Sequence, residues 1–205
     1  MKKIIGIDFS MSKPAACVYI NRQYSFYSWP KELSIKNENA FKNVGVNIFK
    51  RIEVPNKDIV KYDIINSDIL SNLIIKTLIP FLDEETDIAF EGSSFASRGN
   101  VTLSITAWRY ILIYKLSKIV SIDNIFHYSP ITIKKTAGCS QKGKKKEDMI
   151  RAFIESGVDL QLRHELKTTP EKFQKRTGTW IEHLDDLVDA YFTVETFLLK
   201  NPGLR

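Results

Sequence analysis

Two aspartates lie three positions apart near the end of this 205-residue chain, in a segment with helical periodicity. Asp186 and Asp189 fall on one stripe of the predicted helix, together with Thr193, and an apolar flank runs beside them. Ala190 is small enough to let another backbone come close. Two carboxylates on one stripe suit a hard divalent cation, because such ions prefer oxygen ligands and two ions can share them. On this helix alone, a solvated acidic edge is the simpler interpretation.

Two further carboxylates stand at the ends of predicted strands. Asp8 ends the apolar run of residues 2–8, and Glu91 ends a short strand over residues 87–91. A carboxylate at the end of an apolar strand loses hydration, which is unfavourable unless a cation meets it. Each residue alone could instead cap a turn or face solvent. Together with Asp186 and Asp189, they make the four-carboxylate set that phosphoryl transfer by two metal ions requires.

Cations gather in a glycine-containing segment over residues 134–146. They are Lys134, Lys135, Lys142, Lys144, Lys145 and Lys146. A lysine run is usually a solvated loop. Beside a phosphate-cleaving site, clustered lysines would instead neutralise phosphates and make binding weaken steeply with salt. Lys172, Lys175 and Arg176 could extend such a surface.

The elements that must position these residues follow from the apolar periodicity. Strands are predicted over residues 2–8, 15–20, 24–29, 87–91 and 124–129, the first three as an antiparallel meander. Helices are predicted over residues 67–79, with Ser67 as N-cap, and over residues 100–118, 148–155 and from 182 onward. The polar segment 30–66 has no lasting period and is interpreted as an insertion, and residues 168–179 as a polar connection. The pattern predicts an α/β fold with a mixed five-stranded sheet flanked by helices, in one domain over residues 1–205.

Composition narrows the class of protein. A net charge of +6 indicates a polyanionic partner, although an AT-rich coding sequence could also favour lysine. No apolar run looks long enough to span a bilayer, and Asp8 interrupts the start of any signal peptide. Cys17 and Cys139 lie far apart without zinc-ligand spacing. We therefore expect a cytoplasmic protein with reduced thiols and no membrane partner.

Three segments resemble the RuvC family of Holliday-junction resolvases, in the family's order. They are IIGID at 4–8, AFEGSSFASRGN at 89–100 and DLVDAY at 186–191, and the likeness is closest to the bacteriophage branch. The resemblance covers most of the chain except about residues 30–66 and 160–180. It implies a ribonuclease H-like fold, with Asp8, Glu91, Asp186 and Asp189 as ligands of two Mg²⁺ or Mn²⁺ ions. The family often has Pro-Gly after the first aspartate, whereas Phe9 follows here, so this turn is expected to differ.

Further roles follow from this resemblance and from position. The family has a lysine-bearing loop where residues 134–146 lie and an aromatic residue near Phe95, which predicts DNA contacts by these lysines, Phe95 and Arg98. Phe95 would wedge against bases at the branch point; packing under its own loop is the alternative. His183 lies near the acidic stripe and could relay a proton. Asp185 points away from Asp186 and is expected to face solvent or support the site.

The expected function is a metal-dependent endonuclease that resolves four-way junctions by paired symmetric nicks, with metal-activated water attacking in line. Such a substrate predicts a two-fold symmetric homodimer, and the largely apolar helix over residues 100–118 is the predicted interface. If the chain is phage-encoded, it would act in a bacterial host cell. Two alternatives stay open. One is an actin-like sugar or acetate kinase, although the turn at residues 10–13 lacks glycine; the other is a non-catalytic module that binds branched DNA.

Overall fold

The structure is a computed structural model that describes residues 2–92, 100–141 and 146–204. Six strands form a single sheet in the order β4-β3-β2-β1-β5-β6. The elements are β1 (Lys3–Asp8), β2 (Ala15–Ile20), β3 (Gln23–Ser28), α1 (Ile35–Lys42), β4 (Val46–Ile48), α2 (Ile59–Leu78), β5 (Asp87–Glu91), α3 (Asn100–Leu116), β6 (Ile125–Tyr128), α4 (Pro130–Thr136), α5 (Lys146–Glu155), α6 (Gln161–Thr168) and α7 (Glu182–Lys200), with short 3-10 turns at Ile79–Phe81, Ile122–Asn124, Pro170–Phe173 and Pro202–Leu204.

The mixed sheet flanked by helices confirms the predicted α/β class, but the sheet has six strands instead of five. β1, β2 and β3 form the predicted antiparallel meander, and β5 and β6 run parallel to β1. The additional strand, β4, pairs in parallel with β3 and lies within residues 30–66. Three residues are too few to produce a periodic signal in the sequence. The same segment holds α1 and the first turns of α2, and its status as an insertion in a single domain stays a prediction.

Helix α2 begins eight residues earlier than predicted, at Ile59 instead of residue 67. Asp58 is its N-cap and accepts hydrogen bonds from the backbone N–H groups of Val60 and Lys61. Ser67 lies inside the helix, where its hydroxyl donates to the carbonyl of Ile64. The prediction was wrong because capping residue types also occur within helices, where they bond to the preceding turn.

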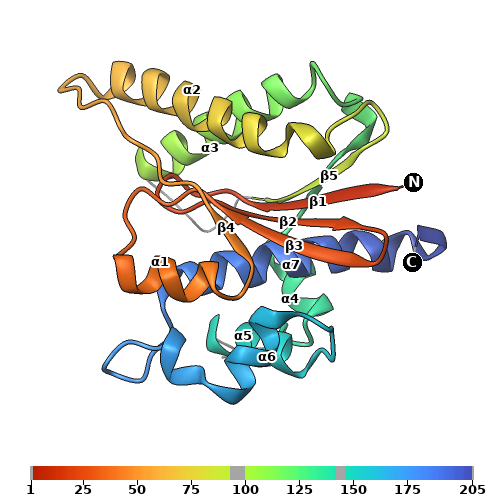
Figure 1. Ribbon diagram of the computed structural model, residues 1–205. Helices are drawn as coiled ribbons and strands as arrows, with labels where there is room; N and C mark the ends of the chain where they lie inside the picture. The colour runs from red at the N-terminus through yellow and green to blue at the C-terminus, as the bar shows by residue number, and fades with distance from the viewer. Residues whose placement is uncertain (1, 93–99, 142–145, 205) are drawn as a thin grey trace.

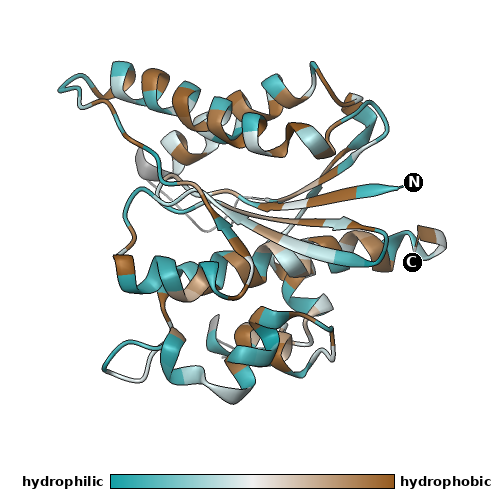
Figure 2. Cartoon of the chain, in the orientation of Figure 1, coloured by the Kyte–Doolittle hydropathy of each residue, from teal (hydrophilic) through white to brown (hydrophobic). Residues whose placement is uncertain are grey.

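The helices form layers on both faces of the sheet (Figure 1). Helices α2 and α3 cover one face, and α7 crosses the other, with α5 and α6 beyond it. Strand residues alternate between the two resulting cores: Ile4 packs with α7, whereas Ile5 and Ile7 pack with α2 and α3. Apolar residues follow the strands and these helices, while α1 is mostly hydrophilic (Figure 2). Helix α7 therefore lies directly against the sheet, where its acidic stripe can meet the strand ends.

Within the described part of the chain, one helix is long and apolar enough, by length and composition alone, to cross a membrane. It covers Ile59–Phe81 and has a mean hydropathy of 1.3, and 33% of its most apolar 18-residue stretch is buried in the protein. This corrects the expectation that the chain has no such segment. Leu70, Ile74 and Leu78 are fully buried in the core beside the sheet, and a core helix of a soluble protein satisfies the same test.

Candidate active site

Alternation along two neighbouring strands turns Asp8 and Glu91 toward the same helix. Successive side chains of a strand point to opposite faces. Ile4 on β1 and Ala89 on β5 belong to the core around α7, and Gly6 contacts α7 directly. Asp8 and Glu91 lie an even number of positions further along, so they face α7 as well. Because β1 and β5 pair in parallel register, both carboxylates lie at the same edge of the sheet.

A glycine lets α7 approach this edge. A Cβ atom placed on Gly6 would lie 2.5 Å from the carbonyl oxygen of Ala190 and 2.9 Å from the backbone nitrogen of Val194. The helix backbone thus lies where a side chain would otherwise stand. The predicted close approach at Ala190 is confirmed, and it carries the preceding residue, Asp189, to the strand ends.

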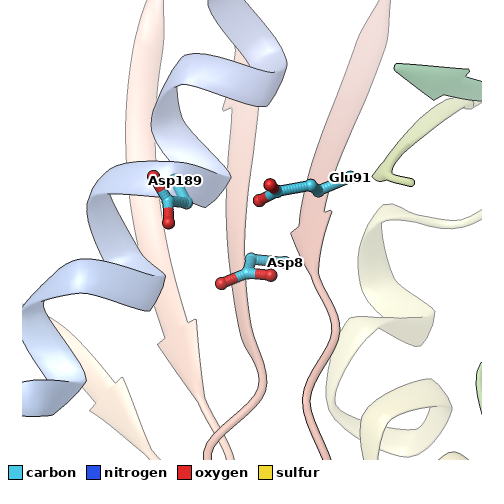
Figure 3. A group of neighbouring side chains, drawn as sticks. All are labelled: Asp8, Glu91 and Asp189. Atoms are coloured by element: carbon cyan, nitrogen blue, oxygen red, sulfur yellow. The ribbon is translucent and has the colours of Figure 1, made fainter. Parts of the chain in front are cut away.

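The three carboxylates converge on one point (Figure 3). Oxygen atoms of Asp8, Glu91 and Asp189 lie within 4.8 Å of one another, and each residue is half-buried. Charges of the same sign repel at this separation unless a cation stands among them. Oxygen ligands lie about 2.1 Å from Mg²⁺ and about 2.4 Å from Ca²⁺, so three oxygens this close together can share one ion. The residues present therefore fit a divalent metal. We call Asp8, Glu91 and Asp189 the triad.

Asp186 lies beside the triad without joining it. All four acidic residues line one cavity of about 460 Å³, so the structure brings the predicted set together. Asp186 is only 5% exposed and forms an ion pair with Lys13, whose Nζ atom lies 3.4 Å from Oδ2. Among the residues that the structure describes, the close carboxylate cluster contains the triad and not Asp186.

Comparison with solved structures identifies the architecture. Thermus thermophilus RuvC in complex with a Holliday junction substrate superposes with a TM-score of 0.52 at 11% identity, over 98% of this chain and 96% of that one. A second Thermus thermophilus RuvC structure gives 0.51 at 11% identity, over 97% and 96%. The yeast mitochondrial Holliday junction resolvase Ydc2 gives 0.50 at 13% identity, over 98% and 79%. This chain has a RuvC-like fold.

The likeness lies in the fold, because these identities are low. No family model matches the sequence, and no curated protein sequence matches it either. The predicted RuvC-like, ribonuclease H-like architecture is therefore confirmed, whereas the closer likeness to the bacteriophage branch stays a prediction.

Two cations near the carboxylates of this cavity are not predicted by the sequence. Arg109 of α3 is 7% exposed, lines the cavity and donates from Nη1 to the carbonyl oxygen of Glu91 at 3.1 Å. Its burial lowers the pKa of the guanidinium below the usual value. An arginine in the middle of a largely apolar helix was the available signal. Lys13 gave no signal, since its partner Asp186 is remote in sequence.

The structure places His183 in a different cavity. His183 lies with Glu32, Asn37 and Lys175 around a space of about 240 Å³. Burial, reinforced by the positive charge of Lys13, lowers the pKa of His183 to about 4. An imidazole outside the carboxylate cavity is poorly placed to relay a proton there, so the predicted relay has no geometric support. Asp185 is half-buried and is not among the residues that line the carboxylate cavity.

The predicted DNA-contacting lysines that the structure describes differ in their surroundings. Lys134 lies on α4 and lines the carboxylate cavity, while Lys135 on the same helix is exposed. Lys172 pairs with Glu165 at 2.8 Å, and Lys175 pairs with Glu182 at 2.7 Å. These two lysines already have anionic partners, which weakens the prediction that they extend a DNA surface.

Several predicted DNA contacts lie outside the described residues. They are Phe95, Arg98, Lys142, Lys144 and Lys145. The backbone of Lys146 begins α5, but its side chain is likewise outside the description. Their roles stay predictions.

Proposed function

We propose that this chain is a metal-dependent endonuclease that resolves four-way DNA junctions by paired nicks. One observation carries the proposal: the triad and Asp186 share a cavity at the sheet edge of a fold also found in RuvC complexed with a Holliday junction substrate. A carboxylate cluster suits many metal enzymes, and analogy with the RuvC fold favours phosphodiester hydrolysis among them. The compared structures are RuvC and a mitochondrial Holliday junction resolvase, so the actin-like kinase alternative gains no support from them.

The residues of the cavity divide the chemistry among them. Asp8, Glu91 and Asp189 would hold Mg²⁺ or Mn²⁺, and Asp186 would contribute to a second ion. When bound, such ions activate water and neutralise charge on the phosphate that is cleaved. Lys134, on the cavity wall, supplies a cation for a neighbouring DNA phosphate. Arg109 fixes the end of β5 through the carbonyl of Glu91 and so orients one metal ligand.

The proposal includes a homodimer, because two strands of a junction must be nicked. Leu103, Tyr110 and Tyr114 are 69%, 59% and 64% exposed and recur on one side of α3, whose other side packs into the core. We name these three residues the α3 face. Large apolar side chains gathered in this way favour burial against another surface. A two-fold partner would cover this face and present two cavities to one junction.

Cleavage of a panel of labelled DNAs tests the proposal. Four-way, three-way, flap and linear DNAs are incubated in Mg²⁺, and we expect symmetric nicks in the four-way junction. Asp8→Asn, Glu91→Gln and Asp189→Asn should each reduce cleavage by about a hundredfold or more while junction binding persists. Asp185→Asn is the matched control and should cleave like the parent, because Asp185 does not line the cavity.

The outcomes separate the candidate functions. Junction binding without any cleavage in Mg²⁺ or Mn²⁺ would favour the non-catalytic binding module. Cleavage that survives any one triad variant would remove that residue from the site. Equal cleavage of linear and four-way DNA would reject junction resolution while retaining a nuclease.

A further inference from the structure

Arg51 is a buried cation in the segment that joins β4 to α2. Its side chain is 1% exposed and forms an ion pair with Glu53 at 2.6 Å. The Glu53 carboxylate also pairs with the Lys31 ammonium at 2.7 Å and accepts from the Tyr62 hydroxyl at 2.5 Å. A buried charge is unfavourable alone, but it is held in one position when its partners are themselves well bonded. The Arg51 guanidinium therefore has a fixed place in the fold.

This guanidinium reaches the turn that follows β1. It donates from Nη2 to the carbonyl oxygen of Met11. Residues 9–13 contain no proline, so no ring fixes a φ angle in this turn, and its shape depends on contacts from elsewhere. The next carbonyl, that of Ser12, accepts from the backbone N–H of Lys31 at 2.7 Å. Two neighbouring carbonyls of the turn are thus held from outside, by residues of the polar segment that follows β3.

The turn forms part of the wall of the carboxylate cavity. Phe9 and Ser10, which directly follow Asp8, both line that cavity. Met11 is only three residues beyond Asp8, and the peptide units between them are planar and nearly rigid. A turn that moves at Met11 therefore also moves the cavity wall and the end of β1.

The same guanidinium lies against a side chain of α3. Its Cζ atom is 5.6 Å from the centroid of the Trp108 ring, a cation–π contact with a fully buried residue. Trp108 is itself held in place, since its Nε1 donates to Asp63 of α2 at 2.9 Å. The next residue of α3, Arg109, donates to the carbonyl of Glu91 and lines the cavity. Arg51 therefore links the turn after β1 to the helix that contacts the end of β5.

We propose that Arg51 is a positioning residue that holds the ends of β1 and β5 at the separation at which Asp8 and Glu91 bind one divalent ion. Arg51 is not among the described residues that line the cavity, so it acts through the Met11 carbonyl and the Trp108 ring. The inference rests on the proposed metal-dependent function. It gives the polar segment between β3 and α2 a role in that function.

Arg51→Met tests the inference, because methionine keeps much of the side-chain length and removes the guanidinium. The affinity for Mn²⁺, measured by isothermal titration without DNA, should fall about 10–100-fold, the usual loss when a residue that orients metal ligands is removed. In junction cleavage kcat should fall too, whereas KM should change less, because the substitution lies outside the cavity. Arg51→Lys keeps the charge but lacks the planar fork, so it should recover melting temperature more fully than Mn²⁺ affinity.

A matched control separates positioning from general stability. Thr86 is fully buried, and its hydroxyl donates to the carbonyl of Phe81 at the opposite end of β5 from Glu91. Thr86→Val should lower the melting temperature, yet leave Mn²⁺ affinity and kcat unchanged at temperatures where the protein is folded. If Arg51→Met does not fold, the double variant with Glu53→Gln removes both charges of the buried pair and provides the second measurement.

Hydrogen exchange reports on the turn without any metal or DNA. The Lys31 amide, which donates to Ser12, should exchange faster in Arg51→Met than in the parent, and at the parental rate in Thr86→Val. Parental exchange at Lys31 in Arg51→Met would overturn the proposed hold on the turn.

The failures of the two proposals are distinguishable. A parent that binds Mn²⁺ and cleaves junctions, with Arg51→Met at parental affinity and kcat, would overturn the role of Arg51 alone. Equal losses of Mn²⁺ affinity in Arg51→Met and Thr86→Val would do the same, because stability would then explain both. A parent that binds no Mn²⁺ would overturn the proposed function together with this inference.

Discussion

Gly6→Ala should separate the strand ends from α7 and thereby disturb the triad. The added Cβ would lie 2.5 Å from the carbonyl oxygen of Ala190, so the helix must move by about 1 Å to reach an ordinary contact. Overpacking of a core is unfavourable by about 1–3 kcal/mol, and a backbone obstacle that cannot rotate away puts this substitution at the upper end. Alanine recovers about 0.4–1 kcal/mol by restricting the unfolded chain.

The net loss in the free energy of unfolding is thus about 2 kcal/mol, or about 4–8 °C in melting temperature for a chain of this size. Calorimetry with and without Mn²⁺ measures it, and Gly6→Ala should also lose most of the increase in melting temperature that Mn²⁺ gives the parent. Gly203→Ala is the control, because a Cβ there meets nothing within 4 Å. A Gly6→Ala protein that melts like the parent and keeps the full response to Mn²⁺ would refute the close-approach argument.

Three further predictions follow from the site and its surroundings. His183, with its pKa lowered to about 4, stays neutral in the folded protein, while the same histidine in the unfolded chain takes up a proton below about pH 6.5. The free energy of unfolding should therefore fall by as much as about 3 kcal/mol as the pH drops from 6.5 to 4. Urea titrations should show a smaller fall in His183→Gln. Lys134→Gln should weaken junction binding and reduce, by about 1, the slope of the logarithm of the binding constant against the logarithm of the salt concentration. Lys135→Gln, at an exposed position of α4, should change binding less. Equal slopes in the parent and Lys134→Gln would show that Lys134 does not contact a phosphate. Leu103→Glu on the α3 face should shift the protein to monomer in analytical ultracentrifugation, whereas Ile35→Glu, at a site 73% exposed on α1, should not.

Much of the sheet could be predicted because its strands are apolar and regular. Ile4, Ile5 and Ile7 alternate between two cores, and their run identifies β1 without any tertiary knowledge. β4 could not be predicted in the same way, since its three residues form a strand only because β3 offers an edge. The predicted start of α2 lies too late because polar residues in its first turns form contacts within the protein instead of marking a helix end. The Asn66 side chain, for example, hydrogen-bonds to both the backbone N–H and the carbonyl of Val54.

The sequence predicts which four carboxylates lie in one cavity, but not that three of them cluster closely while Asp186 stands apart. Strand ends and helical spacing suffice to nominate Asp8, Glu91, Asp186 and Asp189, because each signal is local. Asp186 lies outside the close cluster and pairs with Lys13, which comes from a turn far away in the chain, so this contact has no local signal in the sequence. His183 lies near the acidic stripe in sequence, yet in the fold it lines a different cavity, which sequence proximity alone does not predict.

The position of α7 in the chain has a consequence for synthesis of the protein. The meander that carries Asp8 leaves the ribosome well before the helix that carries Asp189. Contacts so distant in sequence form late, because the intervening loop must close before they stabilise anything. A nascent chain therefore holds an incomplete set of metal ligands, and the core face that contains Ile4 and Cys17 waits uncovered until α7 docks. Docking of α7 would at once bury that face and complete the carboxylate cluster, so a chain without α7 exposes a surface that chaperones can bind.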